Sequence, residues 1–195
     1  GVLLDKYIFR KRKALDNQTC NHIISIFEKS NPVFREEHDY YRISPHLIED
    51  IKFSFLKPIL RKYIGEYLKK HIFLRRFYAK WDVDDRFNIQ KYNPGQYYDS
   101  MFDVVGCQGH MEHGPNEYDS LRLVGWMFYL NDIKNKGGTC WPQQNFTSKP
   151  RAGDLYIWPA GWTHSHYGVP TPTETKYIIT GWCSFSSTGM FGASV

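Results

Sequence analysis

The sequence predicts an α+β fold dominated by antiparallel strands, with its helices in the N-terminal part. Three observations predict it: helix-like spacing of apolar residues up to about residue 70, strand-like segments after residue 87, and turn signals between those segments. The chain has 195 residues, 42% of them hydrophobic, which suffices for a core without metal or disulfide support. Since no internal repeat or low-complexity tract is present, we expect residues 1–195 to form one domain.

Two helices are expected before the strands begin. The first spans residues 16–31, with Asp16 or Asn17 as its N-cap. Its apolar face is formed by Cys20, Ile23, Ile24 and Phe27. Apolar residues at intervals of three or four predict a second, longer helix between Pro45 and Lys70. We expect that helix to be kinked or interrupted near Pro58, because proline lacks the backbone N–H that a helix interior needs.

The strand candidates are rich in aromatic and β-branched residues. They are residues 87–92, 122–130, 154–158 and 176–185. Turn signals at 93–95, 137–138 and 151–154 separate them and permit tight reversals. This alternation of short strands and turns is typical of a jelly roll or sandwich with supporting helices.

Composition and charge exclude several classes of protein. The net charge is +5, with basic clusters at Arg10–Lys13 and at Lys69, Lys70, Arg75 and Arg76. Because no nucleic-acid motif accompanies these clusters, we interpret them as a solvated face and expect no nucleic-acid partner.

Location is indicated by what the sequence lacks. No apolar run approaches the roughly 18 residues that span a bilayer, and residues from Gly1 onward do not resemble a signal peptide. The four cysteines include no C-x-x-C pair, so neither a zinc ribbon nor a small disulfide framework is indicated. We therefore expect no membrane partner and a cytoplasmic location.

The tripeptide His110-Met111-Glu112 is the first chemical signal. Residues two apart on a strand point to the same side, so His110 and Glu112 can be adjacent metal ligands. A third ligand can come from the segment Thr163–His166, in which His164 and His166 alternate and either could point inward. Two histidines and one carboxylate leave three coordination positions open, which suits a non-haem Fe(II) that must bind a cosubstrate and oxygen.

Five motifs give this signal its context. They are Tyr92-Asn93-Pro94-Gly95-Gln96, Phe128-Tyr129-Leu130-Asn131-Asp132, Gly137-Gly138-Thr139, Pro150 with Gly153 three positions on, and the stretch from His166 to Tyr177. In this order, over roughly residues 87 to 185, they resemble the prolyl-4-hydroxylase-like Fe(II)/2-oxoglutarate-dependent dioxygenases. The resemblance implies a double-stranded β-helix (jelly roll) over about residues 81–190, with helical support over about residues 1–80.

The same resemblance assigns roles to individual residues. It implies that His110, Glu112 and His166 bind the iron. Lys176 follows His166 by ten residues, as in the family, and would anchor the distal carboxylate of 2-oxoglutarate; a carboxylate buried there needs a charged partner. It further implies that the Tyr129 phenol hydrogen-bonds this carboxylate; the alternative is that Tyr129 is an aromatic residue of the hydrophobic core. Two more cosubstrate-binding residues complete the set: Met127, packed on its carbon chain, and Tyr92, lining the pocket.

One alternative register remains open. The commoner family pattern is Y-x-x-G-Q-x-Y-x-x-H-x-D, and counting from Tyr92 places Met101 and Asp103 in the H and D positions. A thioether is a poor substitute for imidazole on Fe(II). We favour the register through His110 and Glu112, with an insertion from about residue 99 to 109 that would form a loop over the substrate site.

The expected function follows from the resemblance: hydroxylation of an unactivated C–H bond with Fe(II), 2-oxoglutarate and O2, and with ascorbate as a candidate stimulant. The substrate would be a peptide, a protein or a small molecule, with peptidyl proline as the first candidate. Two other functions stay open. A non-catalytic β-helix binding module would accord with the Met101 register, whereas a cupin-like metalloenzyme would not use 2-oxoglutarate. Lys176 distinguishes the latter from the dioxygenase.

Overall fold

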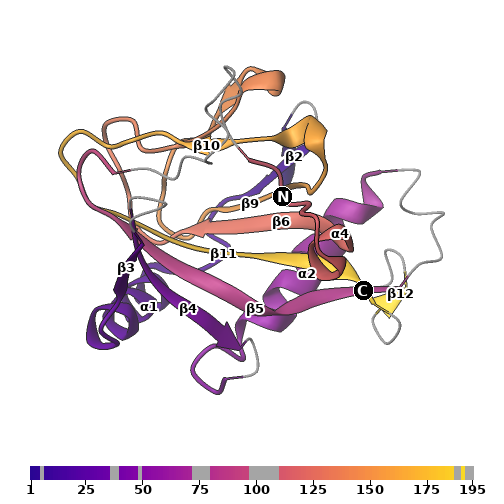
Figure 1. Ribbon diagram of the computed structural model, residues 1–195, viewed down its shortest axis with the longest axis horizontal. Coiled ribbons are helices and arrows are strands. Elements are labelled where there is room, and N and C mark those ends of the chain that lie inside the picture. The colour runs from indigo at the N-terminus through magenta and orange to yellow at the C-terminus, as the bar shows by residue number, and fades with distance from the viewer. Residues whose placement is uncertain are drawn as a thin grey trace.

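A large antiparallel sheet dominates the computed structural model, which describes residues 1–4, 7–35, 40–47, 50–71, 80–96, 110–186 and 190–191. Its strands follow the order β1-β2-β9-β6-β11-β5-β4-β3, and β12 pairs with β5 (Figure 1). Their bounds are β1 Val2–Leu4, β2 Ile8–Lys11, β3 Val33–Arg35, β4 Tyr40–Leu47, β5 Lys80–Tyr92, β6 Arg122–Tyr129, β9 Leu155–Pro159, β11 Lys176–Phe185 and β12 Met190–Phe191. The structure is thus mostly antiparallel sheet with few helices, as the sequence predicts.

A second, three-stranded sheet has the order β10-β7-β8. It consists of β7 Thr139–Trp141, β8 Phe146–Thr147 and β10 Tyr167–Gly168. The shorter helices are α4 Glu117–Ser120, η3 Pro142–Gln144 and η4 Trp162–His164. In Figure 1, β10 lies above β9, β6 and β11 of the large sheet, and α1 lies at the lower left, beside β3 and β4.

Helix α1 spans Asn17–Lys29 and begins where the sequence predicts. The Asp16 side chain accepts a hydrogen bond of 2.7 Å from the backbone N–H of Thr19, which satisfies one of the free donors at the helix start. The predicted apolar residues Cys20, Ile23 and Phe27 are buried. The helix is therefore held to the sheet by its amphipathic face.

The second helix, α2, spans Leu56–Lys69, so the prediction of a helix from Pro45 was wrong in its first part. Residues up to Leu47 belong to strand β4, and Ile51, one of the apolar residues whose spacing predicted the helix, is 88% exposed. Pro58 lies in the first turn of α2, where the backbone N–H that proline lacks would have no helical partner. Proline therefore marks the start of this helix and does not interrupt it.

The large sheet packs into a hydrophobic cluster on each of its faces. Since side chains alternate along a strand, neighbouring residues of one strand belong to opposite clusters. Trp126 and Phe128 of β6 join the cluster that includes the buried faces of α1 and α2. Met127 and Tyr129 of the same strand join the opposite cluster, which also includes Trp141 of β7. This second cluster lies between the two sheets and borders the residues that the sequence singles out.

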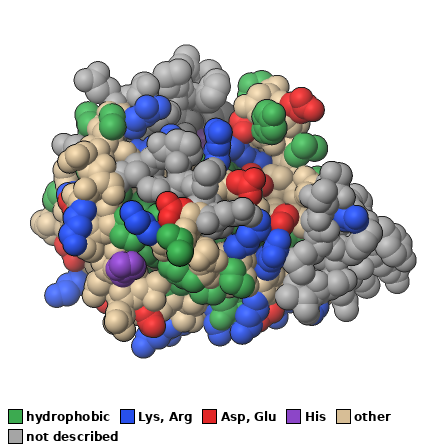
Figure 2. Space-filling model, turned by 90° about the horizontal axis from the view of Figure 1, so that it is seen from below, with side chains coloured by type: hydrophobic (Ala, Val, Ile, Leu, Met, Phe, Trp, Pro, Cys, Tyr) green, Lys and Arg blue, Asp and Glu red, His purple; other side chains and the backbone are tan. Residues whose placement is uncertain are grey.

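Charge is spread over the surface shown in Figure 2, where Lys and Arg side chains are interspersed with Asp and Glu side chains. Among the described cysteines, Cys20, Cys140 and Cys183 are free thiols. None of the helices in the described ranges has the length and apolarity to cross a membrane. The cytoplasmic location expected from the sequence stays a prediction.

Candidate metal centre

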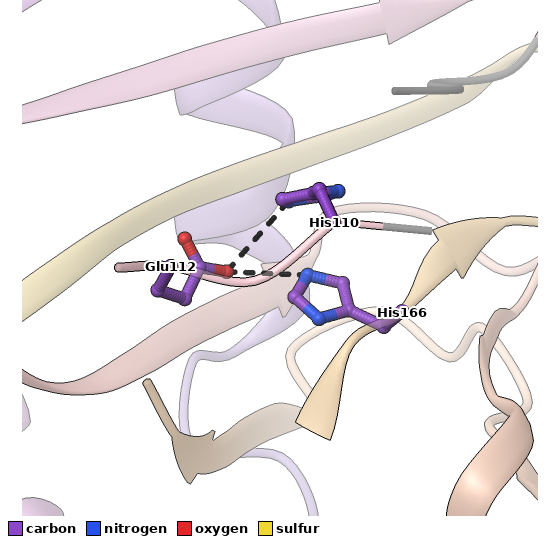
Figure 3. Close-up of side chains that lie close together, drawn as sticks. All are labelled: His110, Glu112 and His166. Atoms are coloured by element: carbon purple, nitrogen blue, oxygen red, sulfur yellow. Dashed lines mark ion pairs between the residues drawn. The ribbon is translucent and has the colours of Figure 1, made fainter. Parts of the chain in front are cut away.

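The backbone brings His110 and His166 together by a short antiparallel bridge. The N–H of His110 donates to the carbonyl of His166 at 2.8 Å, and the N–H of His166 donates to the carbonyl of His110 at 2.9 Å. The N–H of Glu112 donates to the carbonyl of Ala160 at 3.1 Å, which extends the contact to the end of β9. Two segments more than fifty residues apart thus present the three side chains to one another (Figure 3).

The three side chains form the group that the H-x-E signal predicts. Oε1 of Glu112 lies 3.1 Å from Nε2 of His166 and 3.8 Å from Nε2 of His110. One ligand atom from each residue fits within 4.8 Å of the others. Glu112 and His166 are buried, and His110 is partly accessible. Their role as iron ligands stays a prediction, because proximity alone does not establish binding.

His166 is oriented by the backbone of His164. Nδ1 of His166 lies 3.0 Å from the carbonyl oxygen of His164. A carbonyl only accepts hydrogen bonds, so Nδ1 must carry the proton, which leaves the lone pair of Nε2 free to bind a metal. The ring of His164 instead contacts the Thr163 hydroxyl at 2.9 Å and lies outside the group of three. Nε2 of His113 lies 2.8 Å from the carbonyl oxygen of Arg122, and His113 is not part of the group of three.

Glu112 is prepared to be an anionic ligand. In the metal-free protein burial opposes its ionisation, but the hydrogen bond that Nε2 of His166 donates when both ring nitrogens carry protons, the charges of protonated His166 and His110, and the hydrogen bond from Trp182 outweigh burial and hold its pKa at about 2. A bound metal would take the place of the Nε2 proton. Because this pKa lies below the ordinary 4.5, ionised Glu112 stabilises the fold above pH 4.5, and the contribution is lost as the pH falls toward 2.

An aromatic wall leads away from the metal centre. The ring of His166 lies 5.0 Å from Trp158 and 5.7 Å from Trp141. Trp141 contacts Tyr156 at 6.3 Å, and Tyr156 contacts Tyr129 at 5.8 Å. These residues share one buried cluster with the predicted pocket residues Tyr92 and Met127. The triad of His110, Glu112 and His166 therefore borders the region that the sequence predicts to hold 2-oxoglutarate.

Lys176 is a buried cation at the other end of this cluster. It is 2% exposed, and its Nζ donates to the carbonyl of Gly137 at 3.0 Å and lies 4.7 Å from the ring centroid of Tyr92. No carboxylate in the described part of the chain pairs with it. Burial lowers its pKa from 10.5 to about 7. A buried ammonium whose contacts, within the described residues, are a carbonyl oxygen and an aromatic ring is suited to an anionic ligand.

Tyr129 has partners that the sequence reasoning missed. Its hydroxyl lies 2.5 Å from Oγ of Ser148 and 3.1 Å from Oγ1 of Thr139, and burial raises its pKa. Thr139 belongs to the Gly-Gly-Thr motif, so the motif contained a signal for it, whereas only the pairing of β7 with β8 brings in Ser148. The hydroxyl of Tyr92 donates to Oε1 of Gln90 at 2.7 Å. Direct contacts of Tyr129, Tyr92 and Met127 with a cosubstrate stay predictions.

Comparison with known proteins assigns the chain to a family. The model of the 2OG-Fe(II) oxygenase superfamily matches residues 87–184, half of the chain, so the chain belongs to this superfamily. The resemblance inferred from the motifs is thereby confirmed. The alternative register through Met101 and Asp103 lies outside the described residues.

Individual relatives give the comparison its scale. The chain is 30% identical over 120 residues to a probable prolyl 4-hydroxylase 9 of Arabidopsis thaliana, covering 50% of this chain and 40% of that protein. It is 26% identical over 121 residues to a putative prolyl 4-hydroxylase of Acanthamoeba polyphaga mimivirus, covering 55% and 48%. This chain thus spans less than half the length of these two curated relatives.

Solved structures share the fold. The 2OG complex of a viral collagen prolyl hydroxylase from Paramecium Bursaria Chlorella virus-1 superposes with a TM-score of 0.69 at 18% identity, covering 95% of this chain and 100% of that one. A prolyl-4-hydroxylase of Pseudomonas putida gives a TM-score of 0.65 at 13% identity, covering 92% and 93%. At these identities the likeness concerns the fold alone.

The residues present fit the iron and 2-oxoglutarate of this superfamily. Two imidazoles and one carboxylate are the donor set that Fe(II) takes when coordination positions must remain open. The buried Lys176, which has no described carboxylate partner, fits a ligand that carries a second carboxylate.

The pKa of Lys176 predicts a pH dependence for 2-oxoglutarate binding. Below about pH 7 the lysine is already charged; above it, the lysine must take up a proton to pair with a carboxylate. We therefore expect the affinity of the metal-loaded protein for 2-oxoglutarate to be level just below pH 7 and to fall by up to about tenfold per pH unit above it. Isothermal titration calorimetry at pH 7, 8 and 9 measures this. A Lys176→Met variant should show no such slope, and a parallel slope in both proteins would refute the assignment.

Proposed function

We propose that the chain carries an Fe(II)- and 2-oxoglutarate-dependent dioxygenase activity that hydroxylates an unactivated C–H bond, as prolyl 4-hydroxylases do. The observation that carries the proposal is the pairing of two sites across one buried aromatic cluster. The group of His110, Glu112 and His166 borders it on one side, and the buried Lys176 lies against Tyr92 on the other. This combination would suit Fe(II) together with a cosubstrate that carries two carboxylates.

We also propose that the large and small sheets form the two halves of a double-stranded β-helix. The described strands are antiparallel within each sheet, and the cluster of Tyr92, Met127, Tyr129 and Trp141 lies between the sheets. The support would occupy about residues 1–80, where strands β1 to β4 accompany helices α1 and α2, and the β-helix about residues 81–190 of one domain.

The residues of the chain would divide the work as follows. His110, Glu112 and His166 would hold the metal, and the carbonyl of His164, by accepting from Nδ1 of His166, would leave Nε2 as the metal-binding nitrogen. Lys176 would fix the far carboxylate, and the aromatic cluster would exclude water. When bound, Fe(II) and 2-oxoglutarate supply the activation of oxygen, in which 2-oxoglutarate is converted to succinate and carbon dioxide.

A peptide or protein is the proposed substrate class. The support is that the named relatives are prolyl 4-hydroxylases, and that one structural neighbour, from Trichoplax adhaerens, is a prolyl hydroxylase in complex with a peptide fragment. Exposed apolar side chains also adjoin the triad along the chain: Met111 is 45% exposed and Trp162 is 72% exposed. These side chains could receive an extended peptide beside the metal.

Trp162→Ala is expected to raise the KM for a proline-containing peptide by about tenfold, because exposed tryptophans are common anchors of peptide interfaces. Steady-state kinetics with varied peptide measures this. Ile51→Ala, which also removes an exposed apolar side chain, is the control and should leave KM unchanged. An equal KM in both variants would exclude Trp162 from the substrate site.

Succinate formation tests the proposed function. The protein is loaded with Fe(II) without oxygen, supplied with 2-oxoglutarate and a proline-containing peptide, and then exposed to oxygen. Turnover should be present in the parent and lost in His110→Ala and His166→Ala, whereas His164→Ala, two residues before the bridge at the end of η4, should retain it.

Absent turnover would be followed by binding measurements. Retained binding of Fe(II) and 2-oxoglutarate would indicate that the peptide is the wrong substrate. Iron binding without 2-oxoglutarate binding would favour the cupin-like alternative, and loss of both would favour a non-catalytic module.

A further inference from the structure

In this chain a glutamate, Glu112, stands where the commoner H-x-D pattern has an aspartate. Glu112 has one methylene more than aspartate, and the residue is only 7% exposed. Protein interiors are packed without spare volume, so an additional buried methylene needs space that another residue gives up. The structure identifies that residue.

Gly125, in the interior of β6, provides the space. A Cβ atom built on Gly125 would lie 3.0 Å from Cγ of Glu112, and 2.8 Å from two ring atoms of Trp158. A glycine inside a strand costs conformational entropy, and the backbone here is not in the left-handed region that would require one. The requirement is therefore one of volume: any side chain at this position would press on the Glu112 methylene.

Two tryptophans border the gap above Gly125. Gly125 pairs with Trp158 of β9 on one side and with Trp182 of β11 on the other. Directly paired residues of antiparallel strands share one face of the sheet. The Glu112 side chain therefore lies over a row in which a glycine separates two indoles.

Trp182 fixes the far end of the Glu112 side chain. Its Nε1 donates to Oε2 of Glu112, so Oε1 is the oxygen left facing His166, at 3.1 Å. Arg122 contacts both residues. Its guanidinium carbon lies 3.8 Å from the ring centroid of Trp182, and its Nη1 donates to the backbone carbonyl of Glu112 at 2.9 Å. Nη2 of Arg122 in turn pairs with Asp119 at 2.8 Å.

We propose that Gly125 and Trp182 form a seat that makes the metal site specific for glutamate: Gly125 accommodates the additional methylene, and Trp182 selects the oxygen that faces the metal. Both are positioning residues. This inference rests on the proposed function, because it assumes that Glu112 is a metal ligand, but it concerns the chain's own packing and can be tested without turnover.

A double-mutant cycle on Mn(II) affinity tests the role of Gly125. Mn(II) accepts the same nitrogen and oxygen donors and needs neither oxygen nor 2-oxoglutarate. Gly125→Ala should weaken Mn(II) binding by about tenfold with Glu112 present, but by no more than about twofold in the Glu112→Asp background. The contact with Trp158 is disturbed in both backgrounds, so it cancels in the comparison.

Gly181→Ala is the matched control for general damage to the sheet. Gly181 is also a strand glycine beside an indole, and a Cβ there would lie 2.5 Å from Trp126, but on the helix-covered face. This variant should lower the melting temperature and leave the Mn(II) affinity of the folded protein unchanged in both backgrounds.

Trp182→Phe tests the second half of the seat and does not depend on Gly125→Ala folding. Phenylalanine keeps a ring under Arg122 but removes the N–H donor. The absorption bands of bound Co(II) should shift, because Oε2 of Glu112 is then free to approach the metal. In the Glu112→Asp background the same substitution should leave the bands unchanged, since the shorter side chain does not reach Trp182.

The outcomes separate the two levels of inference. Equal losses from Gly125→Ala in both backgrounds, or unchanged Co(II) bands in Trp182→Phe, would overturn the seat while leaving the proposed function intact. Absence of Mn(II) binding in the parent would overturn both. The seat would be supported if Gly125→Ala weakened Mn(II) binding about tenfold with Glu112 present and at most about twofold with Glu112→Asp, while Gly181→Ala left Mn(II) affinity unchanged.

Discussion

Glu112→Gln is expected to weaken Fe(II) binding by about 100-fold or more and to reduce succinate formation to background. The substitution keeps the size of the side chain and an acceptor for Trp182, but it removes the anionic donor of the triad. With its pKa held at about 2, Glu112 is charged at any useful assay pH, so the variant loses a full charge. Loss of an outer partner of a metal ligand already costs about 10–100-fold, and loss of the ligand charge should cost more.

Anaerobic Fe(II) titration followed by tryptophan fluorescence measures this affinity, since Trp141 and Trp158 lie beside His166. Glu117→Gln is the control: it is the same chemical change on an exposed residue of α4. Unchanged Fe(II) affinity in Glu112→Gln would remove Glu112 from the ligand set. It would also return weight to the register through Met101 and Asp103.

The strands that hold the site could be predicted because their signals are local. The expected segment 176–185 is β11 residue for residue, and the expected 122–130 differs from β6 only at its last residue. Met127 and Tyr129, two residues apart on β6, lie on one face, as alternation along a strand requires. Strand β5 begins seven residues before the predicted segment 87–92, because its polar first half is held by pairing with β11 and β12.

The remaining features depend on contacts between distant segments. The strands of the small sheet are only two or three residues long, too short for a periodic pattern, so the partnership of Tyr129 with Ser148 was not foreseeable. Alternation alone did not choose between His164 and His166; the ten-residue offset from Lys176, as in the family, favoured His166, and in the structure it is His166 that forms the bridge to His110. A glycine in β6 gives no indication that Glu112 lies above it until the sheet is assembled.

Lys176→Met is expected to raise the KM for 2-oxoglutarate by about 100-fold, because removing one partner of a buried charge pair typically costs about 2–5 kcal/mol. The thioether fills the space of the lysine stem, so the loss is one of charge and not of packing. Succinate formation at varied 2-oxoglutarate, with Fe(II) saturating, measures it. Lys91→Met is the matched control. Lys91 lies on β5 opposite Tyr177, the residue that follows Lys176 on β11, and its ammonium donates to Glu28 near the surface.

The same substitution should have the opposite effect on the empty protein. In the absence of 2-oxoglutarate, the described contacts that offset burial of the Lys176 ammonium are those with the Gly137 carbonyl and the Tyr92 ring. With a pKa near 7 in the folded state and 10.5 when unfolded, the lysine destabilises the fold at pH 7, and this cost disappears as the pH rises toward 10.5. Lys176→Met should therefore raise the melting temperature at pH 7 while weakening cosubstrate binding.

This opposition distinguishes a binding residue from a structural one. If Lys176 served the fold, its substitution would lower the stability of the protein. If its ammonium reached solvent, substitution would change neither the stability nor the affinity for 2-oxoglutarate. A charge that is buried at a cost to the fold is explained by the ligand that offsets the cost. If Lys176→Met left the 2-oxoglutarate dependence unchanged, the cupin-like alternative would gain and the buried charge would need another anion.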